Sequence, residues 1–129
     1  MPNAVAVLVD TSILIDLLRG HPAARDYLRG LEDPPLASEV TRVEILRGLR
    51  AAERDPTERL FDTLRWASVD EVIARRAGEL GRRWERHRPG IALADLIIAA
   101  TAEHLGADLV TTNVRHFPMF PALVPPYRA

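Results

Sequence analysis

The 129-residue sequence contains no cysteine and no lysine. Without cysteine the protein has no disulfide bonds and no thiolate metal sites, and this composition fits a reducing compartment. Without lysine, every mechanism that requires a lysine side chain is excluded, and all 17 basic residues are arginine. A GC-rich genome explains this bias more simply than phosphate recognition does, although arginine suits bidentate phosphate contacts.

The sequence also lacks a long apolar run and a strong net charge. The longest apolar stretch, residues 97–102, is far shorter than a membrane span, and residues 1–4 have no basic region of the kind that opens a signal peptide. The formal net charge of −1 gives no global basic field. A chain of this length buries roughly two-thirds of its unfolded surface. We therefore expect one cytoplasmic domain over residues 1–129, with no membrane contact.

Hydrophobic patterning predicts strands alternating with helices. Residues 5–9 are apolar throughout, which is typical of a buried parallel strand. We expect strands over 5–9, 36–37 and 107–113, helices over 13–19, 23–30, 38–53, 55–64, 68–87 and 91–106, and an extended segment over 117–129. Ser38 or Thr41 can begin the third helix, and both Thr41-x-x-Glu44 and Ser68-x-x-Glu71 have capping-box spacing. This order predicts an α/β fold with a central parallel sheet flanked by helices.

Three carboxylates stand out against this pattern. Asp10 ends the most hydrophobic strand and is followed by Thr11 and Ser12, which makes three candidate helix caps where one is enough. Asp95 is the only charge in the stretch ALADLIIAA, where an acid in the first turn of a helix is an equally good interpretation. Glu44 lies on a small, apolar helix face, with the capping box as its alternative role.

These acids are expected to meet at one edge of the sheet. Ligands of parallel sheets bind beyond the carboxyl ends of the strands, where Asp10 and Asn113 are predicted to lie. Carboxylates gathered in a cleft repel one another unless a cation neutralises them. Oxygen ligands favour Mg²⁺ or Mn²⁺ over Zn²⁺, and the four histidines, which we expect to be surface or packing residues, lack metal-ligand spacing. Such a metal commonly activates water and stabilises charge on a phosphate.

Three stretches carry a family resemblance. VLVDTSILIDLLRG (7–20), VTRVEILRGL (40–49) and ALADLIIAATAEHLGADLVTTNVRHF (92–117) resemble, in this order and spacing, the PIN-domain ribonucleases, and most closely the VapC-type toxins of bacterial toxin–antitoxin pairs. The resemblance implies a Mg²⁺- or Mn²⁺-dependent endoribonuclease that cleaves tRNA or ribosomal RNA and so stops translation. It further implies a homodimer and a small antitoxin whose C-terminal segment occupies the acidic groove.

The resemblance also assigns roles to residues. The family's site positions fall on Asp10, Thr11 or Ser12, Glu44, Asp95 and Asn113. Asp10 and Asp95 would ligate the metal, Glu44 would do so directly or through water, and Ser12 and Asn113 would orient water. Because the amide of Asn113 carries no charge, a second metal would be held less tightly.

Two other functions stay open at this point. One is a non-catalytic PIN-like module that binds RNA or protein, and the other is a metal phosphatase acting on small substrates. A phosphoacceptor receiver domain is rejected because the chain has no lysine. Arg47 and Arg50 share a face of the predicted helix 38–53, where they are candidates for RNA or partner contact, or simply part of a solvated face.

Overall fold

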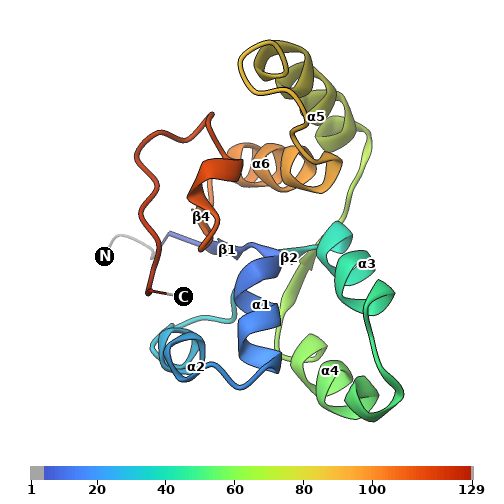
Figure 1. Cartoon of the computed structure of the whole chain (residues 1–129), viewed down its shortest axis with the longest axis vertical. Helices are drawn as coiled ribbons and strands as arrows, with labels where there is room; N and C mark the ends of the chain where they lie inside the picture. Colours follow the sequence, from blue (N-terminus) through green and yellow to red (C-terminus); the bar gives the residue numbers. More distant parts are fainter. Residues whose placement is uncertain (1–4, 129) are drawn as a thin grey trace.

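A four-stranded parallel sheet with the strand order β3-β2-β1-β4 organises the chain (Figure 1). The computed structural model describes residues 5–128. The strands are β1 (Val7–Val9), β2 (Leu36–Ser38), β3 (Arg65–Ala67) and β4 (Asp108–Val110). The helices are α1 (Thr11–Leu18), α2 (Pro22–Arg29), α3 (Glu39–Arg47), α4 (Arg54–Phe61), α5 (Glu71–Trp84) and α6 (Leu93–Leu105), with short 3-10 turns η1 (Ala51–Glu53) and η2 (Val114–His116). The predicted α/β fold is confirmed.

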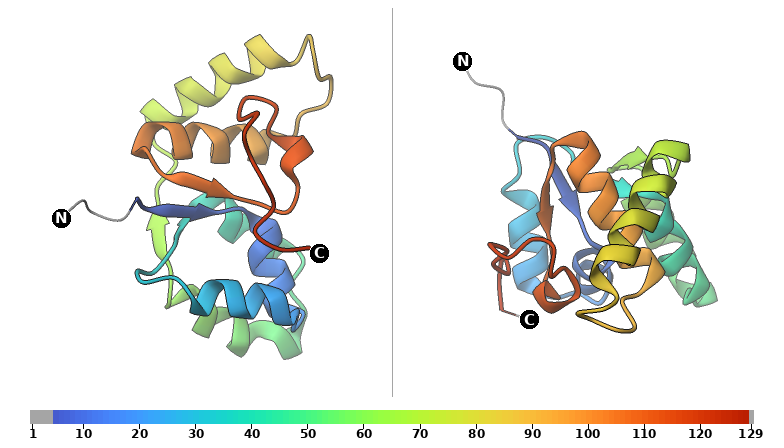
Figure 2. Two further views of the ribbon diagram at one scale, coloured as in Figure 1. Left: turned by 90° about the vertical axis from the view of Figure 1, so that its left-hand side faces the viewer. Right: turned by 90° about the horizontal axis from the view of Figure 1, so that it is seen from above.

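The sheet separates two hydrophobic cores. Successive side chains of a strand point to opposite faces, so Leu8 packs with α5 and α6 while Val9 packs with α1, α3 and α4. Figure 2 shows this layering, with α5 and α6 on one side of the sheet and α1, α2 and α4 on the other. A strand buried on both faces explains why residues 5–9 are apolar without alternation.

The third predicted helix is wrong in its length, but Ser38, one of its two candidate caps, is confirmed. Ser38 begins α3, since its hydroxyl accepts a hydrogen bond from the amide of Val40 at 3.1 Å. The helix ends at Arg47, before Gly48, instead of continuing to residue 53. Thr41 and Glu44 therefore form no capping box. Their side chains bond to α1, as described below.

Other boundaries also differ from the prediction. The sequence analysis missed β3, a three-residue strand that pairs with β2 along its whole length. The predicted strands 5–9 and 107–113 shorten to β1 and β4. The Ser68–Glu71 capping box is wrong as well, because α5 is capped by Asp70, whose side chain accepts from the amide of Ile73 at 3.0 Å.

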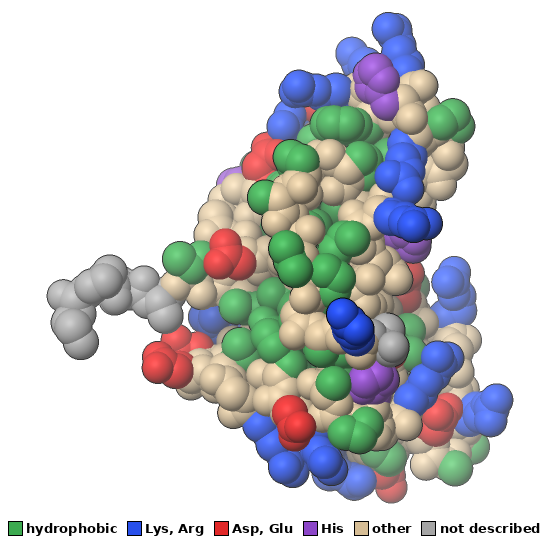
Figure 3. Space-filling model, turned by 60° about the vertical axis from the view of Figure 1, so that its left-hand side comes forward, with side chains coloured by type: hydrophobic (Ala, Val, Ile, Leu, Met, Phe, Trp, Pro, Cys, Tyr) green, Lys and Arg blue, Asp and Glu red, His purple; other side chains and the backbone are tan. Residues whose placement is uncertain are grey.

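The C-terminal segment returns across the molecule toward α1 (Figure 1). Met119, Phe120 and Leu123 pack against the core of α5 and α6, and the Tyr127 hydroxyl donates to Asp16 at 2.9 Å. Figure 3 shows hydrophobic side chains running through the middle of this face, with basic side chains toward its top, its right-hand side and its bottom. No helix within residues 5–128 is long and apolar enough to cross a membrane.

Candidate functional site

Asp10 lies at the carboxyl end of β1 and is almost fully buried, with 3% of its surface exposed. Its backbone amide donates to the carbonyl of Val110, which continues the pairing of β1 with β4. One carboxylate oxygen accepts from the amide of Thr11 at 2.8 Å, so Asp10 does cap α1. The other accepts from the hydroxyls of Thr111 at 2.7 Å and Ser12 at 3.1 Å. Asp10 therefore caps α1 and also lies where the predicted site requires it.

Thr11 connects α1 with α3. Its hydroxyl lies 2.6 Å from Oε1 of Glu44, to which it donates, and 2.9 Å from Oγ1 of the fully buried Thr41. Glu44 consequently has a partner on α1 that fixes the direction of its carboxylate. This contact accounts for an acid on the small, apolar face of α3.

Asp95 lies in the first turn of α6 and is largely buried, with 15% of its side chain exposed. Burial raises its pKa to about 6, and the charges of Asp10 and Glu44 act in the same direction. His116, from η2, opposes this rise with Nδ1 at 3.2 Å from the carboxylate. Repulsion among the three carboxylates is therefore a property of the fold, as the sequence predicts.

The turn after β4 completes the site. Thr111 is buried, and its hydroxyl accepts from the amide of Asn113 at 2.9 Å while it donates to Asp10. Asn113 is exposed. This arrangement fixes the backbone of the turn relative to the carboxylate of Asp10.

All of the predicted site residues line one open cleft of about 470 Å³. It contains the six predicted residues, Asp10, Thr11, Ser12, Glu44, Asp95 and Asn113. Asp16, Arg19 and His116 also line it, and the sequence analysis had not assigned them to the site. The carboxylates come from the residue after β1, from α3 and from α6, so three separate parts of the chain place negative charge at the carboxyl edge of the sheet.

The donor set suits a hard divalent cation. Within residues 5–128, no group of three or more His, Cys, Asp or Glu side chains is arranged to hold a metal ion directly. Mg²⁺ does not need such a cage, because it usually binds one or two carboxylates and keeps several waters. The site offers two buried acids, a third acid that is hydrogen-bonded to Thr11, and an uncharged amide. These groups therefore fit a hydrated ion.

Comparison with known proteins decides the family. The PIN-domain family model matches residues 7–119. The chain belongs to the PIN-domain family. It is 49% identical to Ribonuclease VapC19 of Mycobacterium tuberculosis over 93% of this chain and 98% of that protein, and 48% identical to Ribonuclease VapC10 of the same species over 94% and 92%. A toxin–antitoxin complex from Klebsiella pneumoniae contains a chain with a TM-score of 0.80 and 29% identity, over 96% of this chain and 100% of that one. The resemblance to VapC-type PIN proteins is confirmed.

Sequence reasoning missed two contributors to this PIN-domain site. His116 was assigned to the surface or to packing, yet it contacts Asp95. Thr111 was assigned no role from the sequence, yet it donates to Asp10. A signal for Thr111 was present, because it is a polar residue directly after an apolar strand, as Asp10 is. Nothing in the spacing of His116 indicated that it belongs to the site.

The predicted basic face on residues 38–53 is wrong. Arg47 is the last residue of α3, whereas Arg50 lies beyond Gly48 and precedes η1. The two arginines therefore belong to different elements and share no helix face. Each remains exposed, and whether either contacts RNA stays a prediction.

Proposed function

We propose that this protein is a divalent-metal-dependent endoribonuclease and the toxin of a toxin–antitoxin pair, with one PIN domain over residues 1–129. The observation that carries the proposal is the single cleft in which Asp10, Glu44 and Asp95 meet. Its relatives named as VapC ribonucleases match nearly their whole length, which supports hydrolysis of RNA phosphodiester bonds. The proposed consequence is cleavage of tRNA or ribosomal RNA and arrest of translation.

Asp10 and Asp95 are the proposed direct ligands of Mg²⁺ or Mn²⁺. Both carboxylates are largely buried and lie at fixed element ends, which holds their oxygens in place. When bound, the metal would supply an activated water and stabilise charge on the phosphate. Since the amide of Asn113 replaces a fourth carboxylate, one tightly bound ion is expected.

The remaining site residues orient groups around that ion. Glu44 is held by Thr11, so it would act on the metal through a water molecule and not in direct contact. Ser12 and Asn113 line the cleft with a hydroxyl and an amide that can position water. Thr11 and Thr111 keep Glu44 and Asp10 in their orientations.

A small antitoxin and a second copy of this chain are the proposed partners. The structural relative from Klebsiella pneumoniae is a toxin–antitoxin complex, which supports an antitoxin here. The surface of α3 exposes Val43 and Leu46, and α5 exposes Val72. Exposed apolar side chains on helices support dimerisation through helices, because association would remove them from water.

The non-catalytic module remains the second candidate, and one observation favours it. The amide of Asn113 adds no negative charge to the cleft, which weakens its hold on a metal ion. Such a protein would bind RNA or a partner through the same cleft without cutting. Calorimetry with Mg²⁺ or Mn²⁺ separates the two, since the module needs no ion.

The test is cleavage of labelled total RNA by the purified protein, free of any partner, in Mg²⁺ or Mn²⁺ and with EDTA. We expect fragments that require the metal and disappear on chelation. A parallel panel of mononucleotides and small phosphate esters tests the metal-phosphatase alternative, and we expect no hydrolysis there. Intact RNA in both metals, together with no metal binding by calorimetry, would contradict the nuclease proposal.

A further inference from the structure

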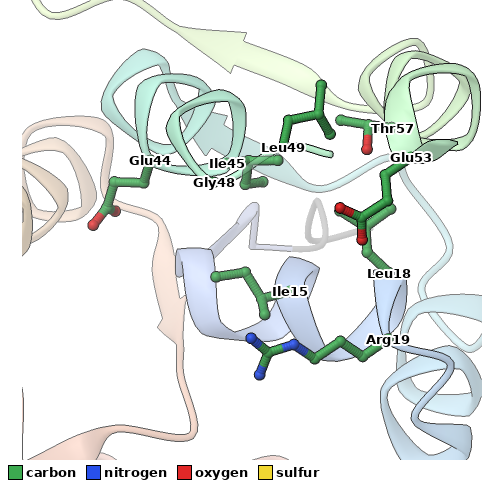
Figure 4. Close-up of a pocket in the computed structure, with 9 residues that line it drawn as sticks. All are labelled: Ile15, Leu18, Arg19, Glu44, Ile45, Gly48, Leu49, Glu53 and Thr57. Atoms are coloured by element: carbon green, nitrogen blue, oxygen red, sulfur yellow. The ribbon is translucent and has the colours of Figure 1, made fainter. Parts of the chain in front are cut away.

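A second cavity opens beside the acidic cleft, and we call it the side groove. It has a volume of about 140 Å³ and lies between α1, α3 and the start of α4 (Figure 4). Its walls include the apolar side chains of Ile15, Leu18, Ile45 and Leu49. Nothing in the proposed chemistry of the acidic cleft uses this space.

The side groove adjoins the acidic cleft. Ile15, Arg19 and Glu44 line both cavities. Figure 4 shows Glu44 at the end of the groove opposite to Thr57 and Glu53. A chain of nucleotides with one phosphate at the carboxylates would therefore have a neighbouring nucleotide at the entrance of the side groove.

Thr57 places an unsatisfied polar atom in the wall of this cavity. The residue is fully buried, and its hydroxyl is the one buried side-chain nitrogen or oxygen within residues 5–128 that has no hydrogen-bond partner. Its hydroxyl points toward Glu53 and Leu18 at the end of the groove in Figure 4. A buried polar group without a partner is costly, so this hydroxyl indicates a ligand that can bond to it.

The chemistry of the lining selects the class of ligand. Among the charged side chains of the lining, the two carboxylates of Glu44 and Glu53 outnumber the guanidinium of Arg19, so the groove disfavours a phosphate of the RNA backbone. An apolar side chain of a partner protein would leave the Thr57 hydroxyl unpaired. A nucleobase satisfies both conditions, because it has uncharged apolar faces and hydrogen-bonding edges.

We propose that the side groove binds one unpaired base of the RNA beside the scissile phosphate and so contributes to the choice of cleavage site. This inference rests on the proposed nuclease function. The base would lie between the apolar walls, with its edge toward the Thr57 hydroxyl. Glu53 uses one carboxylate oxygen to accept from the amide of Arg50 at 2.9 Å and can accept an N–H of the base with the other.

Gly48 makes the proposal testable without disturbing the acids. A Cβ added at Gly48 would meet no heavy atom within 4 Å, and its φ of −97° is accessible to any residue. Because Gly48 lines the side groove, the side chain of Gly48→Leu would occupy part of its space. Gly78→Leu is the matched control, since Gly78 on α5 is equally open and lies outside both cavities.

The experiment uses a short single-stranded RNA pool with randomised central bases, cut in Mg²⁺ or Mn²⁺ and sequenced. Wild-type protein is compared with Gly48→Leu, Gly78→Leu and the isosteric Thr57→Val, and binding of the same pool is measured by fluorescence anisotropy. We expect Thr57→Val to lose base preference by about fivefold at the position beside the cut, as the loss of one hydrogen bond implies. Gly48→Leu should lose preference at the same position, because its side chain occupies space that the base needs. Gly78→Leu should match wild type.

The other possible results contradict either the groove proposal or the nuclease function. Unchanged base preference in both groove variants would overturn the proposal. So would an antitoxin that binds Gly48→Leu more weakly while RNA selectivity stays the same, because the groove would then belong to the partner protein. Wild-type protein that binds the pool without cutting it would contradict the nuclease function alone, and the affinities of Gly48→Leu and Gly78→Leu would still decide the groove.

Discussion

Thr111 donates its hydroxyl hydrogen to Asp10 across 2.7 Å, and so joins two residues that are 101 positions apart. The same hydroxyl accepts from the amide of Asn113. One buried side chain therefore ties the carboxylate at the end of β1 to the turn that follows β4. A parallel sheet makes this possible because both strands end at the same edge.

Replacing Thr111 by valine should damage both stability and activity. The shape is kept, but the hydrogen bond to a buried carboxylate is lost, which costs about 1–3 kcal/mol of unfolding free energy. Because Asp10 loses a group that orients it, we expect RNA cleavage to fall roughly tenfold to a hundredfold. Urea unfolding and a cleavage time course measure the two effects. Thr112→Val, one residue further along, is the control, and an equal loss there would contradict a specific role for Thr111.

Glu44→Gln should lower cleavage without abolishing it. Glu44 is held by Thr11 at 2.6 Å, and its proposed action on the metal runs through water. Loss of such an indirect contact reduces activity by about tenfold to a hundredfold. The rate in saturating Mg²⁺ is the measurement, with Glu39→Gln on the same helix as the control. Complete loss of activity would instead indicate that Glu44 ligates the metal directly.

Thr57→Val should make the protein more stable. Thr57 is buried with no partner for its hydroxyl, so its replacement by an isosteric apolar side chain removes an unfavourable group. We expect a gain of about 1 kcal/mol in the free energy of unfolding. Thr41→Val is the comparison, because the hydroxyl of Thr41 does have a partner in Thr11 and its loss should destabilise. A loss of stability in Thr57→Val would show that its hydroxyl is satisfied in solution.

Sequence patterns predicted the parts of this fold that depend on composition over several residues. The apolar run ending in Asp10 gave the central strand, and the Gly106 that ends α6 lies where predicted, with a φ of 63°. The strand β3 could not be found in this way. It has only three residues and lies at the edge of the sheet, where Arg65 is exposed and pairing with β2 decides its structure.

In the site, too, the local sequence predicted some residues, whereas others depend on contacts between distant parts of the chain. Asp10, Glu44 and Asp95 were recognisable because each is a carboxylate in an apolar surrounding of its own sequence. The partners that orient them were not, since Thr111 reaches Asp10 and His116 reaches Asp95 only through the tertiary fold. The spacing of Thr41 and Glu44 even favoured a capping box, which competed with the contact that both make with Thr11.

The central claim is that carboxylates in the acidic cleft bind a divalent metal that cleaves RNA. The most direct measurement is the initial rate of RNA cleavage in saturating Mg²⁺ by wild type, Asp10→Asn and Asp108→Asn, each below its own melting temperature. Asp108 is an exposed acid at the other end of β4 and controls for the substitution itself. We predict that Asp10→Asn loses more than about a hundredfold in rate, beyond what an indirect contact costs, while Asp108→Asn matches wild type. Cleavage by Asp10→Asn at the wild-type rate would contradict the account.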